Sequence, residues 1–225
     1  MKKREIAKLA TLLGVPLLCV TLQGCIAVPI AAMAYQGLKI HQTTSGGEVR
    51  VEFLDASLSE EDKRSLSKLR RLAIMANPVQ GQTLSTLAKE IKSAGLYEVV
   101  TPYEVDQVLS RTNERLSPAM TDEERRRFYT KITERTKTEA IFVMEVEGSR
   151  FEGNALFSLK APESSMTYTL EIYSPSLKRD IWKQQMKAVV TGNPASQEKS
   201  RREMEEFIAK SIKDKLLEVT GRKAS

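Results

Sequence analysis

The position of the two cysteines limits what can hold this fold together. The chain has 225 residues, and Cys19 and Cys25 are its only cysteines. Two cysteines so close in sequence would close only a short loop, so they do not provide a disulfide framework for the residues that follow. We therefore expect the rest of the chain to fold by the packing of apolar side chains, for which its length is sufficient.

The residues before Cys25 predict a secretory signal. A basic start is followed by an apolar run over residues 9–22, which is too short to span a bilayer, and the small residue Gly24 precedes Cys25. The tetrapeptide Leu22–Cys25 resembles the bacterial lipobox, in which the signal is cut before the cysteine and the cysteine is lipidated. Cys19 follows the bulky Leu18 and is interpreted as an ordinary apolar residue of the removed segment. The alternatives are an uncleaved signal anchor and a plain secretory signal with a chance cysteine.

A lipidated Cys25 would place the mature chain on a membrane. Each buried methylene of an acyl chain contributes about 0.8 kcal/mol, so a triacylated cysteine would be attached effectively permanently. Ile26 stands where an Asp retains many enteric lipoproteins in the inner membrane, which favours the periplasmic face of the outer membrane. We expect a signal peptide over residues 1–24, a membrane-proximal segment over 25–47, a single periplasmic domain over 48–221 and a tail over 222–225.

The net charge argues against a nucleic-acid partner. The whole chain has a formal net charge of +6 and a pI near 9.2. Residues 1–24 hold four basic residues and one acidic residue, so their removal lowers the charge by 3, to +3. A mature chain with so small an excess does not have the electrostatic character of a nucleic-acid-binding protein.

The hydropathy pattern predicts an α+β fold. Apolar and charged residues alternate over Glu48–Phe53, as in a half-buried strand, and residues 139–148 begin apolar on both faces, as in a strand inside a sheet. Further strands are expected over residues 71–76, 96–100, 154–161, 165–174 and 180–190, and helices over residues 59–71, 83–95 and 193–221. This order predicts a mixed α/β sandwich, with a central mixed sheet, a late antiparallel meander, helices packed on its faces and a C-terminal helix.

Two capping motifs predict where further helices begin. Thr101 is followed by Pro102 at the first helical position and, three residues after Thr101, by Glu104; Thr101 and Glu104 form a capping box, and Pro102 is a favourable opening residue. Thr121 and Glu124 repeat the pattern. We therefore expect one helix to start at residue 102 and another at residue 122.

The sequence predicts neither a catalytic nor a metal site. His41 is the only histidine and precedes the expected domain, and no cysteine remains to act with it, so Ser-His-Asp, Cys-His and zinc chemistry are disfavoured. Gly148 and Gly153 have the spacing of a phosphate loop, but the required Lys and Ser/Thr are absent, so the segment is interpreted as a turn. Glu145 and Glu147 are interpreted as a solvated pair. We expect no cofactor and no small-molecule substrate.

A basic cluster is the candidate interaction surface. It contains Arg125, Arg126, Arg127 and Lys131. The aromatic Trp182 on a late strand is a further candidate, and burial in the core is the alternative for this residue. In a membrane-tethered protein such a cluster suits anionic lipid, peptidoglycan carboxylates or a partner subunit. Acidic residues interleave with it, so a solvated helix laced with ion pairs is the interpretation that the sequence favours over an interaction surface.

Residues 87–109, "LAKEIKSAGLYEVVTPYEVDQVL", carry a family resemblance. The helix, the strand "YEVV", the capped turn and the helix "EVDQVL" resemble the periplasmic α/β domain shared by the lipoproteins CsgG, PelC and LpoB and by the N-terminal domain of TolB. The resemblance extends over residues 70–220. It implies a non-enzymatic lipoprotein that acts as a scaffold in export or cell-envelope assembly, as a ring-forming homo-oligomer or with other envelope proteins.

Two alternative functions remain open at this point. One is a monomeric lipoprotein regulator that binds and activates a periplasmic envelope enzyme, such as a peptidoglycan synthase. The other is an enzyme whose catalytic groups come only from Asp, Glu, Lys, Ser and Tyr.

Overall fold

The computed structural model describes residues 39–43, 47–54, 58–75, 80–117, 119–152, 163–192 and 198–223. Residues 40–225 form one compact unit. Several sequence predictions fall outside the described residues: the signal with Gly24 and Cys25, the strand over 154–161, and the helix start at Asn193.

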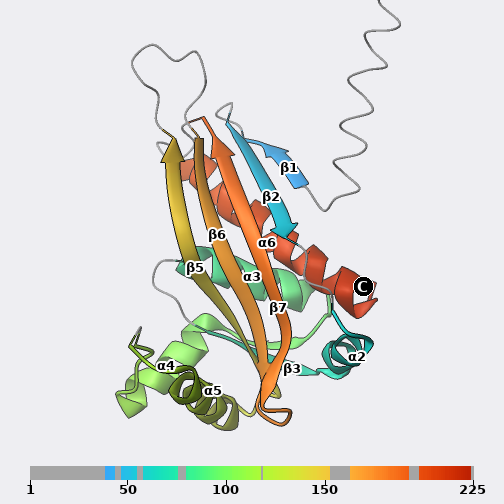
Figure 1. Ribbon diagram of the computed structural model, residues 1–225, viewed down its shortest axis with the longest axis vertical. Coiled ribbons are helices and arrows are strands. Elements are labelled where there is room, and N and C mark those ends of the chain that lie inside the picture. The colour runs from blue at the N-terminus through green and yellow to red at the C-terminus, as the bar shows by residue number, and fades with distance from the viewer. Residues whose placement is uncertain are drawn as a thin grey trace, which may run out of the picture. The chain divides into compact units, whose positions relative to one another are not determined.

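The described strands form one seven-stranded sheet (Figure 1). In spatial order they are β1 (Lys39–Gln42), β2 (Glu48–Leu54), β7 (Arg179–Thr191), β6 (Glu163–Ser174), β5 (Ala140–Glu152), β3 (Arg71–Ile74) and β4 (Glu98–Val100). β2 pairs antiparallel with β7, β7 with β6 and β6 with β5, whereas β3 is parallel to both β5 and β4. The predicted mixed sheet is confirmed, and β5, β6 and β7 are its late antiparallel meander.

Helices cover both faces of this sheet (Figure 1). α2 (Glu60–Lys68), α3 (Gly81–Ser93) and α6 (Glu198–Thr220) pack on one face, and α4 (Pro102–Thr112) and α5 (Asp122–Thr136) pack on the other. The C-terminal helix α6 is as predicted. None of the helices in the described ranges combines the length and the apolar composition needed to cross a bilayer.

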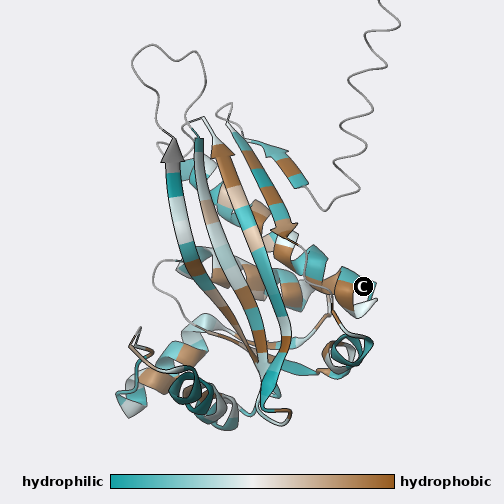
Figure 2. Cartoon of the chain, viewed as in Figure 1, coloured by the Kyte–Doolittle hydropathy of each residue, from teal (hydrophilic) through white to brown (hydrophobic). Residues whose placement is uncertain are grey.

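Alternation along the strands divides the core into two clusters. On β5, Phe142 and Met144 belong to the larger cluster under α2, α3 and α6, whereas Ile141 and Val143 belong to the smaller cluster under α4 and α5. Successive side chains of a strand point to opposite faces, so a strand covered on both faces is apolar at every position. Strands with only one covered face alternate instead, as the bands along β2 show (Figure 2).

Gly148 corrects one prediction from the sequence. It lies inside β5 rather than in a turn, at a register shift where Val146 and Gly148 pair with consecutive residues of β6 and Glu147 is the extra residue. This is a β-bulge, which inserts one residue without ending the strand. The strand therefore continues to Glu152.

His41 corrects a second prediction, because it belongs to the folded unit. It lies on β1, and its ring stacks on Phe207 of α6 with the ring centroids 5.1 Å apart. β1 is an edge strand of the sheet, beside β2. The folded unit therefore begins before residue 48, the boundary expected from the sequence.

Candidate functional site

The predicted capping boxes begin both helices of the α4–α5 layer. The Glu104 carboxylate accepts a hydrogen bond from the Thr101 backbone N–H at 2.7 Å, and the Thr101 hydroxyl oxygen accepts one from the Glu104 N–H at 3.3 Å. Thr121 and Glu124 form the same pair of bonds, at 2.8 and 3.3 Å. These backbone donors hold the pKa of the Glu104 and Glu124 carboxyls below its usual value. The starts of both helices are thereby fixed in position.

The predicted basic cluster lies on α5, and three of its members form ion pairs. Nη1 of Arg125 donates to both carboxylate oxygens of Glu145, each at 3.1 Å. Arg127 pairs with Glu123 one turn earlier, at 2.6 Å. Lys131 pairs with a carboxylate at the end of α4. The contacts agree with the favoured interpretation of α5 as a helix laced with ion pairs.

Glu114 connects the end of α4 to α5. Its carboxylate contacts Lys131 at 3.3 Å and Arg135 at 2.5 Å. The hydrogen bond from the Arg135 guanidinium is the main reason why the pKa of Glu114 lies below its usual value. These contacts hold the loop after α4 against the surface of α5.

Trp182 does not belong to this surface, so its predicted interaction role is wrong. The side chain is 1% exposed and lies in the larger core cluster, with its ring centroid 6.3 Å from that of Phe142. It lies on β7 and points to the sheet face that α2, α3 and α6 cover. An aromatic residue in a strand is packed wherever the face it points to is covered.

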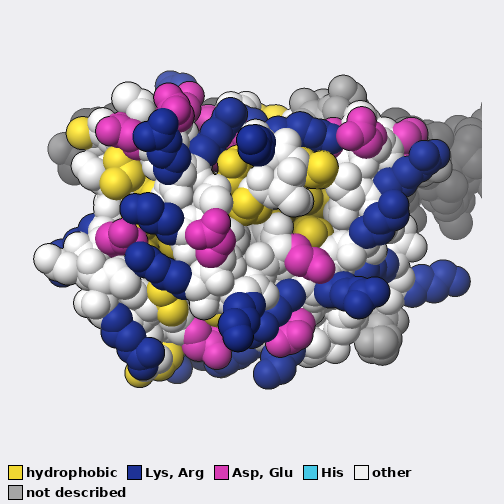
Figure 3. Space-filling model, turned by 90° about the horizontal axis from the view of Figure 1, so that it is seen from below, with side chains coloured by type: hydrophobic (Ala, Val, Ile, Leu, Met, Phe, Trp, Pro, Cys, Tyr) yellow, Lys and Arg dark blue, Asp and Glu magenta, His cyan; other side chains and the backbone are white. Residues whose placement is uncertain are grey.

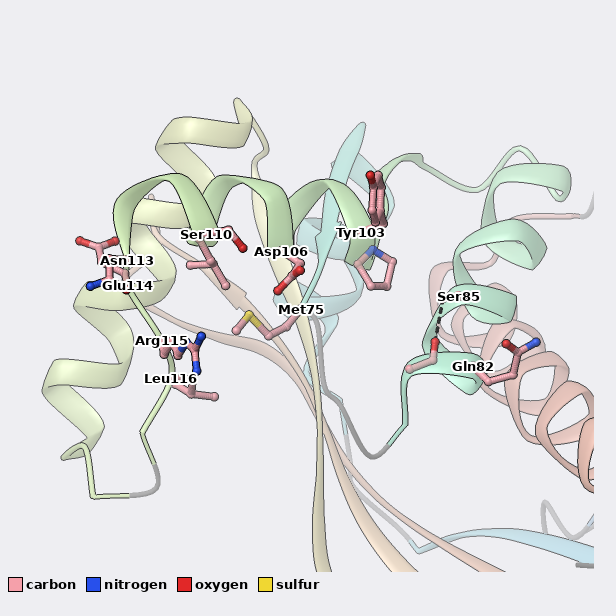
Figure 4. Close-up of a pocket in the computed structure, with 13 residues that line it drawn as sticks. Met75, Gln82, Ser85, Tyr103, Asp106, Ser110, Asn113, Glu114, Arg115 and Leu116 are labelled. Carbon is pink, nitrogen blue, oxygen red and sulfur yellow. Dashed lines mark hydrogen bonds between the residues drawn. The ribbon is translucent and has the colours of Figure 1, made fainter.

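A groove of about 740 Å³ lies between the first turns of α3 and the helix α4 (Figure 4). Met75, which follows β3, lies on its floor, and Leu109 and Leu116 add apolar surface. α3 follows β3 on one face of the sheet, whereas α4 follows the neighbouring β4 on the opposite face. The groove therefore lies at a topological switch point beyond the carboxyl ends of parallel strands, where open α/β sheets commonly bind ligands.

The side chains of the groove suit the docking of another chain. Tyr103 is 69% exposed, and its hydroxyl oxygen accepts a hydrogen bond from Gln107 at 2.8 Å, which holds the ring in place. Asp106 on α4 and Ser85 on α3 lie on opposite sides of the groove (Figure 4). The groove thus combines an oriented aromatic ring with apolar surface and a few polar groups. Among the described residues, no group of three or more His, Cys, Asp or Glu is arranged to hold a metal ion.

A second groove of about 530 Å³ adjoins the first. Met120, Phe128 and Lys131 line it, and both grooves share Glu114 and Arg115. We call the two grooves together the α4–α5 face. Tyr, Met and Arg, which this surface presents, are enriched in protein–protein interfaces.

The charges around the α4–α5 layer are mixed in sign. The side that carries these helices, seen from below, shows Lys and Arg side chains with Asp, Glu and apolar side chains between them (Figure 3). Such a surface offers apolar contact and charge pairing together.

Sequence reasoning missed the residues that form the first groove. Tyr103, Asp106 and Arg115 did not stand out as a set, because they come together only when α4 packs beside α3. One signal was present: Tyr103 lies between the buried Pro102 and Val105 in the first turn of a capped helix. At that helical spacing the large ring must point outward.

Comparisons with known proteins give only distant likenesses. No protein-family model matches the chain, and no curated protein matches it significantly. Among solved structures, the lipoprotein GNA1162 from Neisseria meningitidis is 11% identical, with a TM-score of 0.45, covering 66% of this chain and 99% of that one. The PelC dodecamer from Paraburkholderia phytofirmans is 14% identical, with a TM-score of 0.35, covering 79% and 99%. The hypothetical protein CT253 from Chlamydia trachomatis is 9% identical, with a TM-score of 0.43, covering 68% and 96%. At these TM-scores we draw no functional inference from the likenesses.

Proposed function

We propose that this chain is a non-enzymatic, membrane-anchored lipoprotein that acts as a scaffold in export or cell-envelope assembly, together with copies of itself or with other envelope proteins. The observation that carries the proposal is the α4–α5 face, in which two joined grooves present an oriented Tyr103, apolar floors and charged rims. Interface energy concentrates in such aromatic anchors surrounded by polar residues.

The proposed anchor is the lipidated Cys25, on the periplasmic face of the outer membrane. Its support is the sequence of Leu22–Cys25 and Ile26. A permanent anchor confines the protein to a surface, where its effective concentration toward partners on that membrane rises. Changing Cys25 to Ala should release the protein from the outer-membrane fraction, and unchanged fractionation would contradict the lipoprotein proposal.

A monomeric regulator of a periplasmic enzyme is the second candidate function. One observation favours it: the two grooves share Glu114 and Arg115 and therefore form one continuous face on a single layer of the fold. A regulator that binds its enzyme with 1:1 stoichiometry needs one such face.

The test combines the mass of the native protein with crosslinking. The full-length chain is extracted in mild detergent, and native mass spectrometry distinguishes a closed oligomer from a monomer. In cells, a photo-crosslinking amino acid replaces Tyr103, and the same amino acid replaces Met166, a 39%-exposed residue of β6, as the matched control. Mass spectrometry then identifies the captured chain.

The proposal expects crosslinks from position 103 to a second copy or to an identified envelope protein, and few from position 166. Crosslinks to a second copy in an oligomer support the scaffold, whereas a monomer crosslinked to a periplasmic enzyme supports the regulator. Equal crosslinking from both positions, or none from position 103, would overturn the assignment of the α4–α5 face.

A further inference from the structure

The first groove of the α4–α5 face holds one acidic and one basic side chain without a partner. Three charged residues line this groove: Asp106, Glu114 and Arg115. The carboxylate of Glu114 is engaged by Lys131 and Arg135. Asp106 and Arg115 are exposed, and neither side chain forms an ion pair or a hydrogen bond with another described residue. The groove therefore presents one uncompensated charge of each sign.

The two uncompensated charges lie at different positions along the groove. Asp106 is on α4, whereas Arg115 is in the segment that follows this helix. In Figure 4, Tyr103 and Arg115 lie toward opposite ends of the groove, with Asp106 and Met75 between them. A partner surface of one sign would attract one of the two charges and repel the other. A surface that carries both charges in the reverse order would pair with both.

The same face combines a projecting side chain with a hollow. Tyr103 lies three residues before Asp106 on α4, so the two share one side of the helix, and the Tyr103 side chain is 69% exposed. Leu116 supplies apolar surface beside Arg115 at the other end of the groove (Figure 4). When a twofold axis relates two copies of such a surface, the projection of each copy meets the hollow of the other.

We propose that the first groove is a twofold interface with a second copy of this chain. A twofold contact is reciprocal, so an axis that passes near Met75 places Asp106 of each copy beside Arg115 of the other. The same rotation brings each Tyr103 to the end of the other groove that holds Leu116. This interface rests on the proposed function and deepens it, because it names a second copy as the partner of the α4–α5 face.

The test reverses one charge at a time in the full-length chain, extracted in mild detergent. Native mass spectrometry over a dilution series measures the fraction of chains in dimers, or in even-numbered oligomers built from dimers. Asp106→Arg opposes two cations at each pairing position and Arg115→Asp opposes two anions, so each variant should weaken the dimer about tenfold or more. Arg111→Asp is the matched control and should leave the dimer unchanged, because Arg111 is an exposed residue of α4 that lines neither groove.

Mixing the two weakened variants distinguishes a specific contact from a general loss of folding. In a mixed pair, the Asp106→Arg chain presents two cations and the Arg115→Asp chain presents two anions, so both pairing positions are again satisfied. One variant carries a ¹⁵N label, so that mixed dimers are recognised by mass. We expect mixed dimers to form as readily as wild-type dimers, and we expect the double variant Asp106→Arg/Arg115→Asp to recover the dimer.

Several results would overturn the twofold interface. They are a monomeric wild-type chain, an unchanged dimer in both single variants, and the absence of mixed dimers. An assembly with an odd number of chains would also overturn it, because such an assembly requires head-to-tail contacts. Failure of the proposed function is recognised separately, since crosslinks from position 103 to another envelope protein would retain the α4–α5 face as a docking surface even where the dimer is absent.

Discussion

The indole N–H of Trp182 is buried, and the described residues provide no hydrogen-bond acceptor for it. Replacing Trp182 with Phe removes this unpaired donor. Trp182 is 1% exposed, so the substitution also removes packed apolar atoms. Truncation of a core Trp or Phe to Ala costs about 3–5 kcal/mol, and Trp182→Phe removes about a third of the side chain, so lost packing should cost about 1–2 kcal/mol. An unpaired buried donor costs about 1–3 kcal/mol, which the substitution recovers.

The two contributions nearly cancel. We expect the free energy of unfolding of Trp182→Phe to lie within about 1 kcal/mol of the wild-type value. Leu170 is fully buried in the same core cluster and carries no polar side-chain atom. The control Leu170→Ala should therefore lose about 2–5 kcal/mol.

Urea unfolding of the full-length chain in detergent measures both variants. Far-UV circular dichroism is the signal, because Trp182 is the only tryptophan and its fluorescence is lost in the variant. A loss above about 2.5 kcal/mol in Trp182→Phe would refute the reasoning, since it would mean that the indole N–H is satisfied in the native state.

Three further predictions concern the ends of the helices. Thr101→Ala removes the N-cap of α4 and should lower the free energy of unfolding by about 1 kcal/mol in urea unfolding, whereas a change below 0.3 kcal/mol would contradict the capping role. The backbone N–H of Thr101 lowers the pKa of Glu104 in the folded state, so the stability that this carboxylate contributes is present above pH 4.5 and is lost as the pH falls through its folded pKa. The difference in the free energy of unfolding between wild type and Glu104→Gln, measured by urea unfolding, should therefore shrink over that pH range. Arg222 donates hydrogen bonds to the backbone carbonyls of Leu96 and Leu69, so Arg222→Ala should cost about 2 kcal/mol, against no change for the exposed Lys223→Ala.

Local signals in the sequence predicted most of the fold. The capping residues Thr101 and Thr121 predicted two helix starts to the residue, because an N-cap interacts only with the turn that it opens. The apolar run that begins β5 predicted a strand covered on both faces. The structure confirms this prediction, because alternate residues of β5 belong to the two core clusters. Gly148 was misinterpreted because a bulge depends on the register of two strands, which the sequence of one strand does not contain.

The candidate site was less predictable than the fold. The Arg and Lys residues of α5 were found as a run in the sequence, but the helix divides them. Arg125 and Arg126 line a small polar cavity between α5 and the strands β5, β6 and β7, whereas Arg127 and Lys131 line the second groove. Trp182 was named as a possible surface residue, with the core as the alternative, because its strand gives no sign of which face is covered. Tyr103 lies in a groove formed by two helices from successive β–α units, so its role depends on tertiary packing.

The division of the core into two clusters has a consequence for how such a protein diversifies. The cluster beneath α4 and α5 is separate from the larger one, with strands β3 and β5 contributing alternate residues to each. Substitutions in the exposed positions of the α4–α5 layer, or in the loop that joins its helices, leave the larger cluster unchanged. Selection for a new partner can therefore act on one layer, while the other continues to supply the stability that tolerates the changes.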